Sequence, residues 1–325
     1  MIYILIKKIL IKGAAGFIGF NLANFLLNKS KHIITGIDNL NDYYSVILKN
    51  RRLAVLKKSK KFNFLKIDIK NKKNVEKIFK KNQFDIVFNL AAQAGVRYSI
   101  DNPAAFVDNN ILGFYNILDA SIKFKVKKLL YASSSSVYGD SKSFPLKENQ
   151  KIDPKNIYGL SKKINEEISQ VASLYNDIQL IGLRFFTVYG EWGRPDMFMM
   201  KYLKSSFYKN NKFYLNNFGK HVRDWTYVKD ICQILNLLIK INSKKKHVVY
   251  NICSNKPVKL MSIISKIDVL TKKKAKITKR ILQKGDIYKT HGSNGLIKKV
   301  TKFKNFTSID RGLKNTVSWY IKNKI

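Results

Sequence analysis

The chain has 325 residues, of which 45% are hydrophobic and 12% aromatic, which excludes an intrinsically disordered protein and allows a sizeable core. Its formal net charge is +41, a value that ordinarily indicates binding to nucleic acid or to an anionic membrane. Only eight of the 62 basic residues are Arg, however, and the Lys residues are spread along the whole chain. We therefore interpret the charge as solvated surface and as the compositional drift of an AT-rich genome.

Short apolar runs and helical patterns alternate through the first 190 residues. The apolar runs predict strands at 9–11, 33–37, 62–67, 85–90, 128–133 and 178–186. The helical patterns predict helices at 17–28, 43–58, 73–81, 104–123 and 157–175. Continuously apolar strands that alternate with helices indicate an α/β protein with a Rossmann-type doubly wound parallel sheet.

The pattern changes beyond residue 190, where single helices are predicted at 197–208, 227–241 and 308–323. We therefore expect a sheet domain at 1–190 and a smaller mixed α/β lobe at 191–325, with a segment at about 222–252 returning to the sheet domain. The first residues, MIYILI, are followed by Lys7 and Lys8. This apolar run is too short for a membrane helix and lacks the features of a signal peptide, so we expect it to lead into a buried strand.

The rarer residue types indicate the compartment and argue against a metal site. The two cysteines, Cys232 and Cys253, form no Cys-x-x-Cys motif, which favours a reducing environment. The four histidines lack the close spacing of zinc ligands. We expect a cytoplasmic protein without a metal, a membrane anchor or a nucleic-acid partner.

A glycine-rich stretch, GAAGFIG, directly follows the first predicted strand and opens a helix. Gly13, Gly16 and Gly19 permit a tight turn and a close approach of the backbone to a pyrophosphate, which the amides of the helix N-terminus then bind. Three glycines alone are also typical of a plain turn. Asp38, at the end of the second strand, strengthens the dinucleotide interpretation, because an acid there binds ribose hydroxyls and repels a 2′-phosphate. Asp68 follows the third strand, where a contact with adenine and a helix cap are nearly equal alternatives.

A Tyr-x-x-x-Lys motif lies at the start of the helix predicted at 157–175. The spacing of Tyr158 and Lys162 places both on one helix face. A free tyrosine has a pKa of roughly 10, and a nearby ammonium lowers it, which would make Tyr158 a general acid and base. In a chain with 17 Tyr and this much Lys, a chance surface pair is the ordinary alternative. The glycine motif upstream and the serine-rich stretch ASSSSVYG at 132–139 favour the catalytic interpretation.

These motifs together resemble the extended short-chain dehydrogenase/reductase superfamily. The blocks DNLNDYY (38–44), AAQAGVRYS (91–99), ASSSSVYG (132–139) and GLRFFTVYGEWGRPDM (182–197) closely resemble the UDP-glucuronate 4-epimerases. The resemblance covers nearly the whole chain, including RDWTYVKD at 223–230. Two residues depart from the family pattern. Lys12 stands where a small hydroxyl residue is usual and points either to solvent or to a phosphate, and Glu191 stands where proline is frequent.

The resemblance implies tightly bound NAD in the domain at 1–190 and a UDP-sugar in the lobe at 191–325. It implies that Tyr158 removes the proton of the sugar 4-hydroxyl while the C4 hydride passes to NAD, and that the 4-keto sugar turns over before the hydride returns. Lys162 would also bind the nicotinamide ribose, and Ser134 would bind the substrate oxygen and Tyr158. A homodimer is common among relatives. Further residues expected at the cofactor site are Phe17, Ile18, Asn39, Ile69, Leu90, Ala91, Ala92 and Asn109, the last with an equal chance of serving only the fold.

Two serines in ASSSSVYG bear on the substrate. Related dehydratases and decarboxylases carry carboxylates where this chain has Ser135 and Ser136, so the resemblance favours epimerisation. A carboxylate there would also repel a uronate, whereas hydroxyls donate to it. Thr187 and Arg194 would complete a carboxylate-binding cradle, because Arg suits two-pronged recognition. A structural ion pair is the alternative for Arg194.

The remaining substrate contacts are expected at the diphosphate. Arg223 matches the family's diphosphate-binding Arg, and Asp286 lies in the GD pair at 285–286. Gln283 stands where galactose epimerases carry Arg, so one phosphate contact is weaker or replaced. Arg97 is expected to approach the substrate.

Three hypotheses follow. The first is an NAD-dependent 4-epimerase that interconverts UDP-glucuronate and UDP-galacturonate. The second is a 4-epimerase of a neutral or N-acetylated UDP-hexose. The third is a nucleic-acid-binding protein on an epimerase scaffold, although such derivatives usually lose the catalytic pair and this chain keeps Ser134, Tyr158 and Lys162.

Overall fold

The computed structural model describes residues 6–208, 211–283 and 285–323. Residues 1–5, expected to lead into the first strand, lie outside the described part of the chain.

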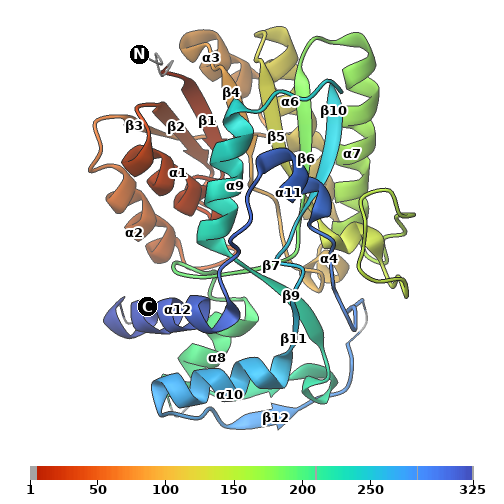
Figure 1. Cartoon of the computed structure of the whole chain (residues 1–325). Coiled ribbons are helices and arrows are strands. Elements are labelled where there is room, and N and C mark those ends of the chain that lie inside the picture. Colours follow the sequence, from red (N-terminus) through yellow and green to blue (C-terminus); the bar gives the residue numbers. More distant parts are fainter. Residues whose placement is uncertain (1–5, 209–210, 284, 324–325) are drawn as a thin grey trace.

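Seven parallel strands form one sheet in the order β10-β6-β5-β4-β1-β2-β3 (Figure 1). Their bounds are β1 (Lys8–Lys12), β2 (Ile33–Asp38), β3 (Phe62–Lys66), β4 (Ile86–Asn89), β5 (Lys128–Ser134), β6 (Gln179–Phe185) and β10 (His247–Ile252). The predicted parallel α/β class is confirmed, and each predicted strand overlaps an observed one. β10 was not predicted. The strand order reverses between β1 and β4, which is where ligands bind in such sheets.

Helices cover both faces of the sheet. One face carries α1 (Phe17–Lys29), α2 (Val46–Leu56), α9 (Val228–Lys240) and α11 (Gly295–Thr301). The other carries α3 (Lys72–Asn82), α6 (Gly113–Lys123) and α7 (Ile157–Tyr175). Because helices cover both faces, the central strands β1, β4 and β5 are buried almost continuously, whereas the edge strand β3 is not.

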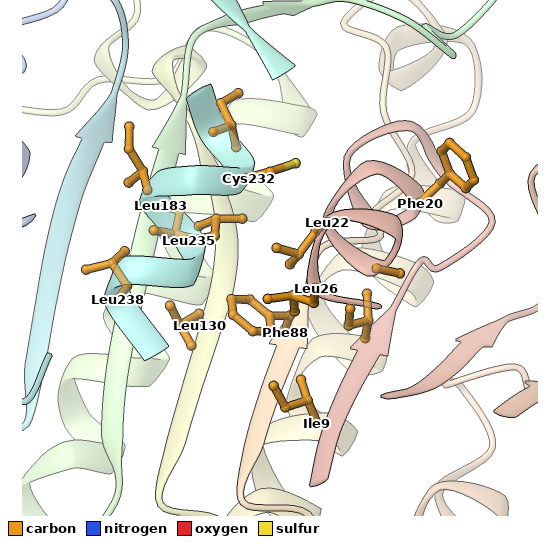
Figure 2. Close-up of a cluster of buried hydrophobic side chains, with 14 of the residues drawn as sticks. Ile9, Phe20, Leu22, Leu26, Phe88, Leu130, Leu183, Cys232, Leu235 and Leu238 are labelled. Carbon is orange, nitrogen blue, oxygen red and sulfur yellow. The ribbon is translucent and has the colours of Figure 1, made fainter. Parts of the chain in front are cut away.

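Helices α1 and α9 pack their leucines directly against the strands of the large sheet. Leu26 of α1 and Leu235 of α9 lie against Phe88 and Leu130 of the sheet, and all four are fully buried (Figure 2). Burial of each such side chain stabilises the fold by about 1.5–3 kcal/mol.

The prediction of one continuous α-helix at 104–123 is wrong, because part of this segment is a π-helix. The segment consists of α5 (Pro103–Phe106), a π-helix (Val107–Leu112) and α6, and it is preceded by a short α4 (Tyr98–Asp101). The wide turn accompanies the burial of Asn110, which is 2% exposed. Its amide binds the backbone of Gln93 and the hydroxyl of Ser161, so polar contacts with distant segments accompany the departure from regular helix geometry here.

The rest of the chain builds a smaller lobe. A three-stranded sheet has the order β11 (Pro257–Lys259), β9 (Val222–Tyr227), β7 (Thr187–Tyr189), and a two-stranded sheet pairs β12 (Ile277–Lys279) with β8 (Phe213–Leu215). The lobe also contains α8 (Phe198–Phe207), α10 (Leu260–Thr271) and α12 (Ile309–Asn323). The predictions at 197–208, 227–241 and 308–323 correspond to α8, α9 and α12, whereas α10 and α11 were not predicted.

The chain passes between the large sheet and the smaller lobe more than once. β9 pairs in the small sheet, while α9 and β10 return to the large one. The division at residue 190 stays a prediction. No described helix has both the length and the apolar content needed to cross a bilayer.

Candidate functional site

Two adjoining cavities lie at the carboxyl ends of the strands. We call the one that contains the glycine loop and Tyr158 the sheet cavity, and the one that contains Thr187 and Arg223 the lobe cavity. Both are lined by Tyr43, Ser134, Phe185, Phe186, Arg194 and Met197. Ser134 and Arg194 therefore face both spaces.

Nearly all residues predicted to bind the cofactor line the sheet cavity. They are Gly13, Gly16, Phe17, Ile18, Gly19, Asp38, Asn39, Ile69, Leu90, Ala91, Ala92, Asn109, Tyr158 and Lys162. Asp68 is not among them. Its carboxylate accepts from the backbone N–H of Lys70 at 2.9 Å, a local turn contact, and Asn71 rather than Asp68 caps α3.

All residues predicted to bind the substrate line the lobe cavity. They are Arg97, Ser135, Ser136, Thr187, Arg194, Arg223 and Asp286. Residues from the 3-10 helix after β5 (Ser135–Tyr138), from β7 and β9 and from the segment near 286 thus meet in one space although they are far apart in the sequence.

The glycine loop has the tight geometry that the motif predicts. Gly13 has φ +86°, and a Cβ there would lie 2.6 Å from that of Ala91. A Cβ on Gly19 would lie 2.1 Å from the Gly13 carbonyl oxygen. Any larger residue would push the loop away from β4 or from α1.

Several features of the sheet cavity fit a dinucleotide. Gly16 caps α1 without a side-chain hydrogen bond, so the first amides of the helix have no side-chain acceptor and suit a phosphate. The buried Nε2 of Gln93, a residue that lines the cavity, has no hydrogen-bond partner among the described residues. Asp38 ends β2 inside the cavity, where a carboxylate suits ribose hydroxyls.

Tyr158 and Lys162 lie at the start of α7, which Asn156 caps by accepting from the Gly159 N–H at 2.8 Å. The ammonium of Lys162 lies 5.9 Å from the centre of the Tyr158 ring. The Ser134 hydroxyl, at the end of β5, lies 3.2 Å from the Ser136 hydroxyl and close enough to Tyr158 to lower its pKa when it donates to that side chain. The three side chains thus form one group.

The charges of this group differ from the prediction in one respect. Burial raises the pKa of Tyr158, and the Ser134 hydrogen bond and the charge of Arg194 lower it. Burial lowers the pKa of Lys162 to about 7, with a further decrease from Lys12. A Lys162 with this pKa is neutral where a free tyrosine ionises, so Arg194 rather than Lys162 is the cation that lowers the pKa of Tyr158 here.

A buried ion pair that the sequence analysis missed lies beneath this group. The Arg184 guanidinium donates to both oxygens of Glu166, at 2.9 and 2.7 Å, and Ser133 donates to the same carboxylate. Both members of the pair are almost completely buried. Glu166 lies one turn beyond Lys162 on α7, and this spacing was the available signal.

Arg52 is a second missed residue, and it joins the walls of the site. It is fully buried and donates to the Ala15 carbonyl and the Tyr44 hydroxyl, both at 2.8 Å, and to the Trp192 carbonyl at 2.6 Å. Trp192 has φ +61° and stands two residues before Arg194. The Arg52 side chain thus connects the glycine loop with the segment that carries Arg194.

Arg194 takes part in the ion pair that was its structural alternative. Its Nε and Nη2 donate to Asp196 at 3.0 and 2.5 Å. It still lines both cavities, so the ion pair and a place at the site occur together.

The remaining predicted residues also have protein partners. Arg223 donates to the carbonyls of Ile287 and Tyr288, and burial lowers its pKa to about 10. Arg97 pairs with Asp286 at 3.2 Å.

Among the described residues, the side chain of Asn109 makes one hydrogen bond, and it is local. Its amide donates to the Ala105 carbonyl at 2.8 Å, although the residue lines the sheet cavity.

Comparisons with known proteins identify one family. Residues 9–253 match the model of the "NAD dependent epimerase/dehydratase family". A UDP-glucuronate 4-epimerase of Thermodesulfobacterium geofontis is 38% identical over 97% of this chain and 96% of its own. Protein CapI of Staphylococcus aureus is 41% identical over 97% of this chain and 98% of its own.

A solved structure agrees with these sequence matches. The UDP-glucuronic acid 4-epimerase of Bacillus cereus, in complex with UDP-glucuronic acid and NAD, superposes with a TM-score of 0.90 at 28% identity, covering 97% of this chain and 99% of that one.

Proposed function

Because the chain belongs to the NAD-dependent epimerase/dehydratase family, we propose that it interconverts UDP-glucuronate and UDP-galacturonate as an NAD-dependent 4-epimerase. One observation carries the proposal. Ser134 and Arg194 line both the sheet cavity, which suits the dinucleotide, and the lobe cavity, which we assign to the UDP-sugar. A reacting sugar at this junction would meet the Ser134, Tyr158 and Lys162 group and a guanidinium together.

Tyr158 is the group proposed to move the proton of the sugar 4-hydroxyl. When bound, NAD supplies a hydride acceptor that later returns the hydride. Tyr158 takes the hydroxyl proton during oxidation and gives it back during reduction, so the protein ends unchanged. Ser134 orients the Tyr158 hydroxyl through their hydrogen bond.

The charge of Lys162 matters for the same proton. Burial and the Lys12 charge lower its pKa to about 7, against the opposing effect of the Glu166 carboxylate. Negative charge on a ligand in the sheet cavity would raise it further, so a protonated Lys162 would then favour the Tyr158 phenolate near neutral pH.

The uronate carboxylate is proposed to bind near Arg194. Asp196 engages Nε and one N–H of Nη2, which leaves N–H groups of the guanidinium for a second carboxylate. Ser135, Ser136 and Thr187 add hydroxyls to the same cavity. Arg223 and Arg97 are proposed to face the diphosphate, with Asp286 holding Arg97 in place.

We further propose a cytoplasmic homodimer that pairs through α6 and α7. The outer face of α7 exposes Val171 (57%), Leu174 (70%) and Tyr175 (83%), and Tyr115 of α6 is 46% exposed. An apolar face of this kind on two adjacent helices is typical of a subunit contact.

The test is to incubate the purified protein with UDP-glucuronate, UDP-glucose or UDP-N-acetylglucosamine and to separate the products. We expect UDP-galacturonate from the first substrate and at most slow turnover of the others. Turnover of a neutral sugar alone would contradict the uronate assignment, and the alternative 4-epimerase would replace it.

A further inference from the structure

Lys12 ends β1 directly before the glycine loop, and its side chain turns into the sheet cavity. It is only 7% exposed, so of the two orientations left open by the sequence the one toward solvent is excluded. The residue is therefore a buried cation at the base of the proposed cofactor site.

The ammonium of Lys12 is held by a single contact. It donates to the Ala91 carbonyl at 2.7 Å, and in the described part of the chain it has no other acceptor and no ion pair. An ammonium carries three N–H groups, so two remain. Burying such a charge is unfavourable unless an anion balances it.

The charged residues around Lys12 do not supply that balance. Those that line the sheet cavity are four basic side chains and one carboxylate, namely Lys12, Lys49, Lys162, Arg194 and Asp38. Burial lowers the pKa of Lys12 to about 8, while Asp38 at the end of β2 and Asp68 after β3 raise it. Most Lys12 side chains are thus protonated at neutral pH, and the cavity has an excess of positive charge that suits an anionic ligand.

We propose that the Lys12 ammonium binds the pyrophosphate of the dinucleotide from the strand side of the glycine loop, opposite the amides of α1. The proposal rests on the proposed function only in taking NAD as the ligand of the sheet cavity. It assigns to Lys12 a direct role in holding the cofactor.

The test compares Lys12→Met, which removes the charge and the donor but keeps most of the length of the side chain, with Lys8→Met at the exposed start of the same strand. Binding of NAD and ADP-ribose to protein stripped of nucleotide is measured by calorimetry at pH 7, and binding of adenosine by competition. We expect Lys12→Met to bind NAD and ADP-ribose at least about tenfold more weakly. Adenosine, which lacks the phosphates, should change by less than about twofold, and Lys8→Met should match the original protein for all three.

Two further variants separate charge from packing. Lys12→Gln keeps a donor for Ala91 and should show the same loss as Lys12→Met, while Lys12→Arg should recover much of the affinity. An unchanged NAD affinity in Lys12→Met, or an equal loss for adenosine, would overturn the proposal while leaving the epimerase assignment intact. An original protein that fails to bind NAD would contradict the proposed function itself.

Discussion

The guanidinium of Arg194 and the carboxylate of Asp196 form a two-bond ion pair at the wall shared by the sheet cavity and the lobe cavity. Asp196 keeps Arg194 charged and fixes the plane of its guanidinium. The pair therefore presents an oriented cation to any acidic group that enters.

Arg194→Lys should lower kcat/KM for UDP-glucuronate about 100-fold, because an ammonium cannot bind two carboxylates with fixed geometry. The amount of bound NAD should not change. The control is Arg311→Lys on the exposed start of α12. Uronate turnover equal to that of the original protein would remove Arg194 from the substrate site.

Asp196→Asn should weaken the binding of UDP-glucuronate about tenfold, because the guanidinium of Arg194 keeps its charge but loses its orientation. This effect should be smaller than that of Arg194→Lys. Steady-state KM measurements with both substrates of the epimerisation test this. Tighter binding would show instead that Asp196 competes with the uronate for Arg194.

Tyr158→Phe should lower kcat by at least about 10³-fold while NAD stays bound. Ser134→Ala should keep more activity and change its pH dependence. Because the Ser134 hydrogen bond lowers the pKa of Tyr158, its loss raises that pKa, and the rise of kcat with pH should move to higher pH. A kcat profile from pH 5.5 to 9.5 shows the shift, and an unshifted profile would argue that Ser134 does not act on Tyr158.

Glu166→Gln should destabilise the fold by about 3–5 kcal/mol, because it leaves Arg184 as an unbalanced buried charge. The control is Glu167→Gln, whose exposed partner Lys163 lies at 3.6 Å and whose loss should cost less than about 1 kcal/mol. Urea unfolding measures both. In the double variant with Arg184→Met the two losses should not add, and strict additivity would contradict a coupled pair.

His247 should make stability depend on pH. Burial lowers its pKa to about 4 in the folded protein, whereas an unfolded His titrates near roughly 6.5. Its stabilising contribution is therefore complete above pH 6.5 and is lost as pH falls toward 4, by about 2–3 kcal/mol after allowing for partial solvent screening. His247→Gln retains a partner for the Tyr131 hydroxyl, 2.8 Å away, and should flatten this decline in unfolding measurements between pH 7.5 and 4.5. An equally steep decline would assign it to other groups.

Patterns that are local in the sequence predicted the fold well. Buried strands such as β1 and β4 are continuous apolar runs, and the glycine spacing and the Tyr158–Lys162 spacing follow from one turn or one helix. β10 was not predicted; its short apolar run directly follows a cluster of lysines at 244–246, a pattern typical of solvated surface.

Contacts between distant segments could not be predicted in this way. Arg52 meets Ala15 and Trp192, which are 37 and 140 residues away, and no periodicity encodes such a contact. The π-helix at 107–112 was missed for the same reason, since it follows from the contacts of Asn110 with Gln93 and Ser161.

The Arg52 side chain limits how the substrate specificity of this protein can evolve. One guanidinium holds a carbonyl of the glycine loop and a carbonyl of the segment before Arg194. A substitution that shifts α2 would therefore disturb cofactor retention and sugar preference together. New substrate specificities should arise more readily through side chains of the lobe cavity, such as Thr187, than through changes in the backbone that Arg52 holds.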